Sequence, residues 1–335
     1  MRFEFYHPGL DRTAKLSVDG TVSHSIHFSH WEGNQTPAEV KADTSTEIAL
    51  NLVASPNRNL LTHGLELVTN NHFDTDGVLS VWTVLTGESA LELRDQLISA
   101  AEAGDFCEFS SENGVRASIV IQGSDQASPT NDSGSPLARK LAGTNVDDDT
   151  RAYDLVLPEV ENVLRHTDHY ESLWREGWEQ IAVTIDSFES GHSQVSEKDQ
   201  GLSLITLAPE IFSTSGLDPL RHAPPFTAIS RYAKGNLFLI ASPVGEGWVY
   251  RLDYPYYSWA ETIVRPRIER RDLTQPLAQL NQLEQTPSAR WKEDTREMTS
   301  AAKFLNEDGT LAASRLQPDV VVRAFSELVQ VSAAF

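Results

Sequence analysis

The 335-residue sequence is poor in the features that place a protein in a membrane or an oxidising compartment. Cys107 is its only cysteine, which excludes a disulfide within the chain and a zinc centre of several thiolates. No apolar run approaches the roughly 18 residues of a spanning helix. The N-terminal stretch "MRFEFYHPGL" lacks the basic start and long apolar core of a signal peptide. We therefore expect a cytoplasmic protein with no membrane partner.

Positive charge is also scarce. The chain has 27 Lys and Arg against 48 Asp and Glu, a formal net charge of −21. Such a surface repels the phosphate backbone of nucleic acids, so no long nucleic acid is expected as a partner. A small anionic substrate stays compatible with this charge if metal ions and a few arginines offset it locally. The sequence indicates no particular oligomeric state.

Common motifs for nucleophilic catalysis and phosphate loops are missing as well. The sequence has no Gly-x-Ser-x-Gly elbow, no Walker loop and no Gly-x-Gly-x-x-Gly after a strand. Cys107 follows a predicted helix and has no evident histidine partner, so we interpret it as a plain thiol. What is present in their place is chemistry suited to metal ions.

Strand-like and helix-like segments alternate along the chain, which predicts an α/β or α+β fold with a mixed sheet flanked by helices. Residues 1–122 are predicted to form a strand-rich α/β part. The polar, Ser-, Gly- and Asp-rich residues 123–150 form either a flexible linker or a lid. Residues 151–335 form a further α/β part, in which a smaller C-terminal α+β portion is possible.

Four local expectations bear on the site. Alternation on both sides of Asp19-Gly20 predicts a β-hairpin over residues 15–30. Residues 64–72 are predicted to form a strand and residues 78–87 a helix. Residues 89–105 are predicted to form a further helix, with Gly104 as its stop signal. The apolar run at 115–123 predicts a strand.

The stretch "NNHFDTDGVLSVW", residues 70–82, carries the most specific chemistry. His72, Asp74 and Asp76 alternate where a strand is expected to end, so they can share one face. Gly77 permits a sharp turn into a helix whose free N–H groups suit an anion. Carboxylates with an imidazole suit Mn²⁺, Zn²⁺ or Fe²⁺, and carboxylates alone suit Mg²⁺. The same residues are also good turn and capping chemistry without any metal.

The motif His72-Phe73-Asp74-Thr75-Asp76-Gly77, followed by Ser80, resembles the first motif of the DHH-type phosphoesterases. That family includes single-strand exonucleases, exopolyphosphatases and cyclic-dinucleotide hydrolases. The resemblance implies that Asp74 and Asp76 hold manganese or magnesium, with His72 as a ligand or a neighbour of the ligands. It covers about 14 residues. Over its whole length the chain looks like an uncharacterised bacterial family.

The Asp-His-His triplet that gives the DHH-type family its name has no counterpart here. The nearest match is Asp168-His169-Tyr170, inside a predicted helix. His166 and His169 share a helical face there, so His169 is a candidate metal ligand, although a solvated pair is the plainer interpretation. His30, at a strand end, and Asp43 are the other candidate ligands from outside the motif.

A segment rich in aromatic and basic side chains, residues 251–273, is the predicted place of substrate binding. Arginine forks suit phosphate or carboxylate, and aromatic planes suit a base or a sugar. A structural patch paired with the many acids is an equal alternative. The substrate-binding candidates are Tyr257, Trp259, Arg265 and Arg267.

Together these patterns predict a divalent-metal-dependent, phosphoesterase-like hydrolase of a small anionic substrate. His72, Asp74 and Asp76 are its catalytic and metal-binding candidates, with Mn²⁺ or Mg²⁺ favoured over Fe²⁺ or Zn²⁺. One alternative is a mononuclear non-haem Fe(II) enzyme, with His72 and Asp74 as half of a two-histidine, one-carboxylate site. The other is a non-catalytic metal-binding or interaction protein.

Overall fold

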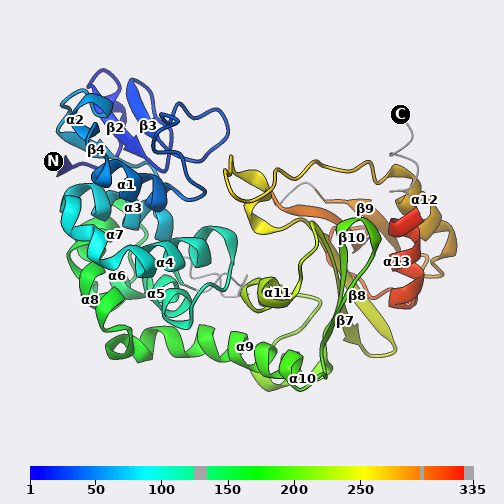
Figure 1. Cartoon of the computed structure of the whole chain (residues 1–335). Helices are drawn as coiled ribbons and strands as arrows, with labels where there is room; N and C mark the ends of the chain where they lie inside the picture. The colour runs from blue at the N-terminus through cyan, green and yellow to red at the C-terminus, as the bar shows by residue number, and fades with distance from the viewer. Residues whose placement is uncertain (124–133, 295–297, 328–335) are drawn as a thin grey trace. The chain divides into compact units, whose positions relative to one another are not determined.

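Two β-sheets organise the chain, each in a unit of its own (Figure 1). The computed structural model describes residues 1–123, 134–294 and 298–327. Within these, the first unit comprises residues 1–123, 134–178 and 259–267, and the second comprises 179–258, 268–294 and 298–327. The mixture of helices with one parallel and one mixed sheet confirms the predicted α/β class.

The sheet of the first unit is short and entirely parallel, in the order β1-β4-β2-β3. Its strands are β1 (Arg2–Phe3), β2 (Lys15–Val18), β3 (Ser25–Phe28) and β4 (Leu67–Thr69). All side chains of the central strands β2 and β4 are buried, as expected for a parallel sheet covered on both faces. Parallel pairing also brings the carboxyl ends of all four strands to one edge of the sheet.

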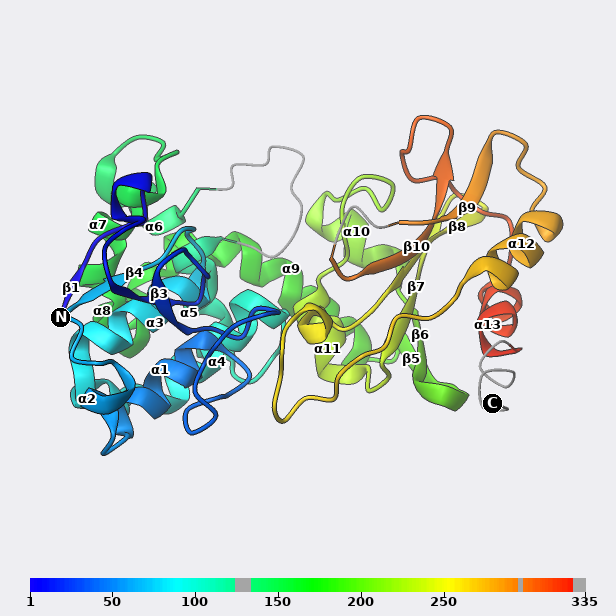
Figure 2. The same cartoon turned by 90° about the horizontal axis from the view of Figure 1, so that it is seen from above.

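Helices dominate the rest of the first unit (Figure 2). Helix α3 packs on the sheet, and α1 and α4 pack on α3, so that the sheet edge faces several helix ends. The helices are α1 (Ser45–Ala54), α2 (Arg58–Leu61), α3 (Thr75–Thr86), α4 (Arg94–Phe106), α5 (Glu112–Gln122), α6 (Pro136–Ala142), α7 (Asp149–Val156), α8 (Val160–Arg165) and the first part of α9 (Glu171–Glu189).

The predicted hairpin over residues 15–30 is wrong, because β2 and β3 pair in parallel. The chain returns between them through residues 19–24, which are anchored by the fully buried Lys15. Its Nζ donates to the backbone carbonyls of Leu10 and Ser23, at 2.8 and 2.6 Å. A buried ammonium whose hydrogen bonds are satisfied by backbone oxygens stabilises this longer return path, which contains no tight hairpin turn. Asp19 therefore stands at a strand end and not in a hairpin turn.

Two further expectations differ from the structure. Residues 115–123 lie mostly in α5 and not in a strand; a short apolar run buried on all sides has no periodicity that separates the two. Of the predicted loop 123–150, residues 124–133 lie outside the described residues, while α6 and the start of α7 occupy much of the remainder. The two units divide within α9, between Trp178 and Glu179. Helices α6 and α8 pack against α5, and this packing keeps the residues before that boundary in the first unit.

The second unit is built on a six-stranded mixed sheet in the order β5-β6-β7-β8-β10-β9. Only β6 and β7 pair in parallel, and the other neighbours are antiparallel. Helices α12 and α13 pack together over the apolar core of this sheet. The elements are β5 (Gln194–Glu197), β6 (Leu202–Thr206), β7 (Leu237–Val244), β8 (Gly247–Asp253), β9 (Ala289–Glu293), β10 (Ser300–Asn306), α10 (Pro209–Ser215), α11 (Phe226–Tyr232), α12 (Thr274–Leu283) and α13 (Pro318–Glu327).

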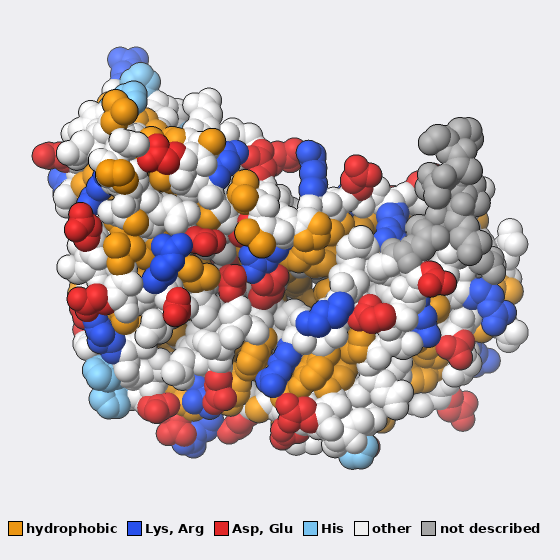
Figure 3. All heavy atoms as spheres, in the orientation of Figure 1, with side chains coloured by type: hydrophobic (Ala, Val, Ile, Leu, Met, Phe, Trp, Pro, Cys, Tyr) orange, Lys and Arg blue, Asp and Glu red, His pale blue; other side chains and the backbone are white. Residues whose placement is uncertain are grey.

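The surface carries both signs of charge. On the face drawn in Figure 3, single Lys and Arg side chains are interspersed with Asp and Glu. In the described part of the chain, no helix combines the length and the apolar character that crossing a membrane requires.

Candidate metal centre

Titratable side chains follow three of the four parallel strands. Asp19 comes directly after β2, His30 lies two residues after β3, and the His72–Asp76 turn follows β4. Because the strands are parallel, these residues meet at one edge of the sheet, where open α/β sheets place their ligands. Helix α4 adds Asp105, one residue before its end.

The turn after β4 has the strand-to-helix form that the sequence predicts. Asp74 is the N-cap of α3, and its Oδ1 accepts a hydrogen bond from the Gly77 N–H at 2.7 Å. A Cβ at Gly77 would overlap the Asn70 amide, so this position requires glycine. The N–H of Thr75 donates to Gln122 Oε1, so side chains already occupy two of the first amides of α3. The expected anion site at this helix end is therefore capped from within the chain.

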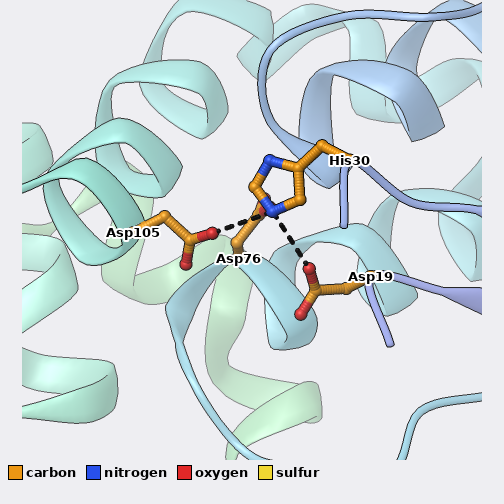
Figure 4. Close-up of side chains that lie close together, drawn as sticks. All are labelled: Asp19, His30, Asp76 and Asp105. Carbon is orange, nitrogen blue, oxygen red and sulfur yellow. Dashed lines mark ion pairs between the residues drawn. The ribbon is translucent and has the colours of Figure 1, made fainter. Parts of the chain in front are cut away.

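The first group of candidate ligands surrounds the His30 ring (Figure 4). Its Nε2 lies 3.1 Å from Asp105 Oδ2, 3.6 Å from Asp19 Oδ1 and 3.8 Å from Asp76 Oδ2. All four side chains are at least nine-tenths buried. One ligand atom from each lies within 4.8 Å of the others, a spacing that a single ion can bridge.

Asp76 is fixed in this group by the start of α1. Its two carboxylate oxygens accept hydrogen bonds from the N–H groups of Ser45 and Thr46, both at 2.7 Å. These two amides have no partner within their own helix, so the carboxylate caps α1 from α3. The same Oδ2 that accepts from Ser45 lies 3.8 Å from His30 Nε2.

The second group shares Asp19 with the first. His72 Nε2 lies 2.8 Å from Asp19 Oδ2 and 3.0 Å from Asp74 Oδ2. Asp19 thus turns Oδ1 toward His30 and Oδ2 toward His72. A carboxylate with its two oxygens in two ligand groups has the geometry of a bridge between two ions.

Unsatisfied buried atoms test whether this set suits a metal. Both oxygens of Asp19 and Nε2 of His30 are fully buried and make no hydrogen bond of good geometry within the described residues. They face partners of opposite charge instead, with Asp19 Oδ2 2.8 Å from His72 Nε2 and His30 Nε2 3.1 Å from Asp105 Oδ2. Asp19 Oδ1 with His30 Nε2, and Asp19 Oδ2 with His72 Nε2, mark two places where a cation would find buried ligand atoms. The donor set, carboxylates with one imidazole in each group, suits Mn²⁺, Fe²⁺ or Zn²⁺.

Without an ion, protons take up the charge imbalance on the imidazoles. Burial alone would lower the pKa of His30, but its carboxylate neighbours, Asp105 foremost, raise that pKa to about 10. Burial likewise works against the charged form of His72, while Asp74 and Asp19 raise its pKa to about 12. Both rings are therefore protonated on both nitrogens, and positively charged, at neutral pH in the metal-free protein.

The carboxyl groups of the cluster differ in the direction of their pKa shifts. Burial raises the pKa of Asp76 to about 7, and the charge of Asp19 adds to that rise. Burial also raises the pKa of Asp105 well above its ordinary value, with Asp76 contributing. Asp19 has a lowered pKa, because His72 outweighs the effect of its burial. A divalent ion would replace protons at these groups, so its affinity depends on pH.

The tautomer of His30 is set on the far side of its ring. Its Nδ1 lies 2.6 Å from the Asp43 carbonyl oxygen, which accepts only from a protonated nitrogen. Nε2 is then the nitrogen that faces the carboxylates and is free to bind a metal. Asp43 itself, a predicted ligand, does not join the cluster. Its carboxylate instead accepts hydrogen bonds from the backbone N–H groups of Ile263, Val264 and Arg265.

The predicted substrate residues separate in the structure. The Arg265 guanidinium binds Asp43, Glu102 and Glu108, so its fork is taken up within the protein and it offers no site for an anion. Trp259 lies edge-on to the His30 ring at 5.0 Å and forms part of the wall of the centre. Arg267 is exposed, and Tyr257 belongs to the second unit.

His169 is also placed away from the centre. It is exposed in a 3-10 turn, Thr167–Tyr170, and stacks on His166 with ring centroids 5.2 Å apart. Neither histidine belongs to a group of ligand atoms close enough for one ion among the described residues. The pair matches the solvated alternative.

Asp19 and Asp105 are the residues that the sequence patterns missed. The Asp19-Gly20 dipeptide favours a hairpin turn, and Asp19 has no alternating His or Asp neighbours of the kind that single out His72. Asp105 follows Gly104, which was expected to stop the helix, whereas α4 continues to Phe106. No local pattern marks Asp105, because its role depends on where α4 lies.

Comparison with known proteins places the chain in a family. Residues 2–324 match the family described as "Family of unknown function (DUF6687)", and the chain belongs to it. A comparison with curated proteins found no match. Among solved structures, the pGpG-specific phosphodiesterase PggH from Vibrio cholerae aligns with a TM-score of 0.33 and 9% identity, over 96% of this chain and 99% of that one. A TM-score of this size does not establish a common fold.

Proposed function

We propose that this member of the DUF6687 family is a divalent-metal-dependent hydrolase of phosphoesterase type, acting on a small anionic substrate. The observation that carries the proposal is the shared Asp19. Its two buried oxygens face two separate ligand groups, one with His30 and one with His72. Binuclear hydrolases hold two ions about 3.5–4 Å apart in this way, through a common carboxylate.

The roles of the residues follow from their geometry. His30, Asp76 and Asp105 would hold one ion and His72 and Asp74 the other, with Asp19 between them. Asp76 and Asp74 are held by helix amides, so neither would need to move on binding. Bound ions of this kind lower the pKa of a coordinated water and offset charge on a phosphoryl group. Mn²⁺ is the metal proposed first, because it accepts both imidazole and carboxylate ligands, and Mg²⁺ is the second, because carboxylates outnumber imidazoles in both groups.

The motif at His72–Ser80 adds independent support, because its resemblance to the DHH-type phosphoesterases concerns the same residues that meet at the sheet edge. The substrate's charge would be met by the metal ions. The described part of the first unit offers neither Arg265 nor the start of α3 for that purpose, since both are engaged internally. A small anion suits such a centre better than a long polyanion on a chain of net charge −21.

The iron-enzyme alternative fits the geometry less well. It needs two histidines and one carboxylate around a single ion. Within the described residues, each group of candidate ligands contains one histidine only. The excess of carboxylates favours hydrolytic metal chemistry over that alternative.

Metal content and hydrolysis of a generic phosphodiester test the proposal together. We expect chelator-treated protein to regain close to two Mn²⁺ per chain and to hydrolyse bis(p-nitrophenyl) phosphate only after metal is restored. Wild-type protein that binds no divalent ion under any of Mn²⁺, Mg²⁺, Zn²⁺ or Fe²⁺ contradicts the proposal. Binding of one Fe²⁺ with an oxygen-dependent activity would favour the iron enzyme instead.

A further inference from the structure

Residues Trp259–Arg267, called the strap below, belong to the first unit although the chain on both sides of them belongs to the second. The strap lies more than 200 residues along the chain from the residues that it contacts around His30. So distant a segment stays in place only if it makes strong contacts of its own.

The strap is attached at two ends by charged groups. At one end, Glu261 accepts hydrogen bonds from the Gly33 N–H at 3.1 Å and the Asn34 side chain at 2.7 Å. At the other, Arg265 spans Glu102 and Glu108 at 2.6 and 2.9 Å. Its guanidinium also lies over the Phe106 ring, 4.9 Å from the centroid.

Asp43 joins the strap to His30. Its carboxylate accepts hydrogen bonds from the three successive backbone N–H groups of the strap from Ile263 to Arg265. It also accepts one from the Arg265 guanidinium at 2.8 Å. Its backbone carbonyl accepts the Nδ1–H of His30 at 2.6 Å. One residue therefore binds the strap with its side chain and orients the imidazole with its main chain.

Two further contacts from the strap reach His30 directly. The N–H of Glu261 donates to the His30 carbonyl at 2.7 Å. The Trp259 ring meets the imidazole edge-on, with centroids 5.0 Å apart and planes at 78°. The strap thus fixes both the backbone and the ring of His30 and leaves Nε2 toward Asp105.

Within the described residues no hydrogen bond joins His72 to the strap, and its link to Trp259 runs only through the Trp31 ring, 5.1 Å from His72 and 6.0 Å from Trp259. The Nδ1 of His72 lies 3.0 Å from Asn71 Oδ1 and its Nε2 lies 3.0 Å from Asp74 Oδ2, both within its own turn. A change in the strap should therefore affect the two ligand groups unequally.

We propose that the strap is a positioning element for His30, with Asp43 and Arg265 as its positioning residues, and that metal binding at the His30 group and docking of the strap stabilise each other. This inference rests on the proposed metal-dependent function. Partners that orient a ligating histidine typically contribute 10–100-fold to metal affinity. Because such coupling is reciprocal, the ion should also tighten the strap.

A double-mutant cycle on Mn²⁺ affinity tests the inference. In a His72→Ala background, which leaves only the His30 group, Arg265→Gln should weaken Mn²⁺ binding about 10–100-fold. In a His30→Ala background the same change should alter affinity less than about twofold. Arg165→Gln is the matched control, since Arg165 also bridges two acids, Glu161 and Glu92, but on an exposed surface. Equal effects of Arg265→Gln in both backgrounds overturn the inference.

Amide hydrogen exchange on the wild-type protein gives a readout that does not depend on the folding of any variant. Adding Mn²⁺ should slow exchange of the amides at 263–265, while amides of a distant helix such as α8 stay unchanged. Strap amides that exchange at the same rate with and without bound Mn²⁺ overturn the coupling, even though the metal site itself stands. Wild-type protein that binds no Mn²⁺ overturns the proposed function and, with it, this inference.

Discussion

The first unit holds two clusters of acids, and the negative charge of each is offset by a different kind of cation. In the ligand cluster, Asp19, Asp76 and Asp105 surround His30. In the second, which we call the Arg265 knot, Asp43, Glu102 and Glu108 surround a guanidinium. Both gather three carboxylates, largely buried, where their mutual repulsion is poorly screened.

The difference lies in the cation. Arg265 is permanently charged and its fork donates to all three acids of the knot, so that cluster is complete without a ligand. The ligand cluster has only imidazoles, and within the described residues both oxygens of Asp19 face these rings without a hydrogen bond of good geometry. In the metal-free protein the protonated imidazoles carry the positive charge of the ligand cluster, and unlike a guanidinium they can give up that proton in exchange for a divalent ion. Four measurements sharpen or break this comparison.

The largest expected effect is that of Asp19→Asn. The change removes the ligand shared by both groups, and the loss of several kcal/mol of metal-derived stabilisation should lower phosphodiester hydrolysis about 10³-fold or more. Metal analysis of the purified variant should show less than one ion per chain. Asp154→Asn, on an exposed face of α7, is the control and should keep full metal content. Retention of two ions by Asp19→Asn would remove it as a bridge.

Arg265→Gln should cost stability even in the absence of metal. It leaves three carboxylates together without their cation, and breaking a buried ion pair from one side costs about 3 kcal/mol or more. Urea denaturation of the chelator-treated protein measures this loss. Arg165→Gln, in an exposed pair, should cost less than about 1 kcal/mol. Similar small losses in both variants would show that the knot contributes no more than a surface ion pair.

The stability of the metal-free protein should fall as pH rises from 5 to 8. The pKa of Asp76 is raised to about 7, so its contribution is present below the unfolded value near 4 and is lost as pH passes through 7. His30, with a pKa of about 10, keeps its charge in the folded protein while the unfolded chain loses it near pH 6.5, so it adds to the fall above that pH. The free energy of unfolding, measured by denaturation in the presence of chelator, should drop by at least about 1 kcal/mol over this pH range.

Excess Mn²⁺ should remove or reverse that pH dependence, because the ion takes over the charge of the cluster. Asp105→Asn should flatten the slope of the chelated protein, since it removes a second carboxyl with a raised pKa. If the stability of the metal-free protein is constant or rises between pH 5 and 8, then Asp76 and Asp105 do not have the raised pKa values described above.

His169→Ala should have the smallest effect. The side chain is exposed, and among the described residues its ring stacks on His166, so Mn²⁺ affinity and hydrolysis should change less than about twofold. Isothermal titration with Mn²⁺ and the phosphodiester assay both report on this. A loss of one bound ion in this variant would mean that the centre extends beyond the residues assigned to it.

The sequence alone was sufficient for the turn after β4. Alternation of His72, Asp74 and Asp76, a capping aspartate and a required glycine are local features, and each depends on a few neighbouring residues. The mixed α/β class followed in the same way from the periodicity of successive segments. His30 is a candidate on local grounds as well, because it lies at the end of a predicted strand, and the structure places it beside three carboxylates.

Tertiary structure alone decided how the centre is completed. Asp19 enters it because β2 and β3 pair in parallel, held by Lys15 and backbone carbonyls, and Asp105 enters because α4 packs on α3. Arg265 changed from a predicted substrate contact to the cation of the knot, through partners some 160 to 220 residues away. Pairing of strands and docking of distant segments depend on the whole chain folding, and local periodicity carries no record of which acids they bring together.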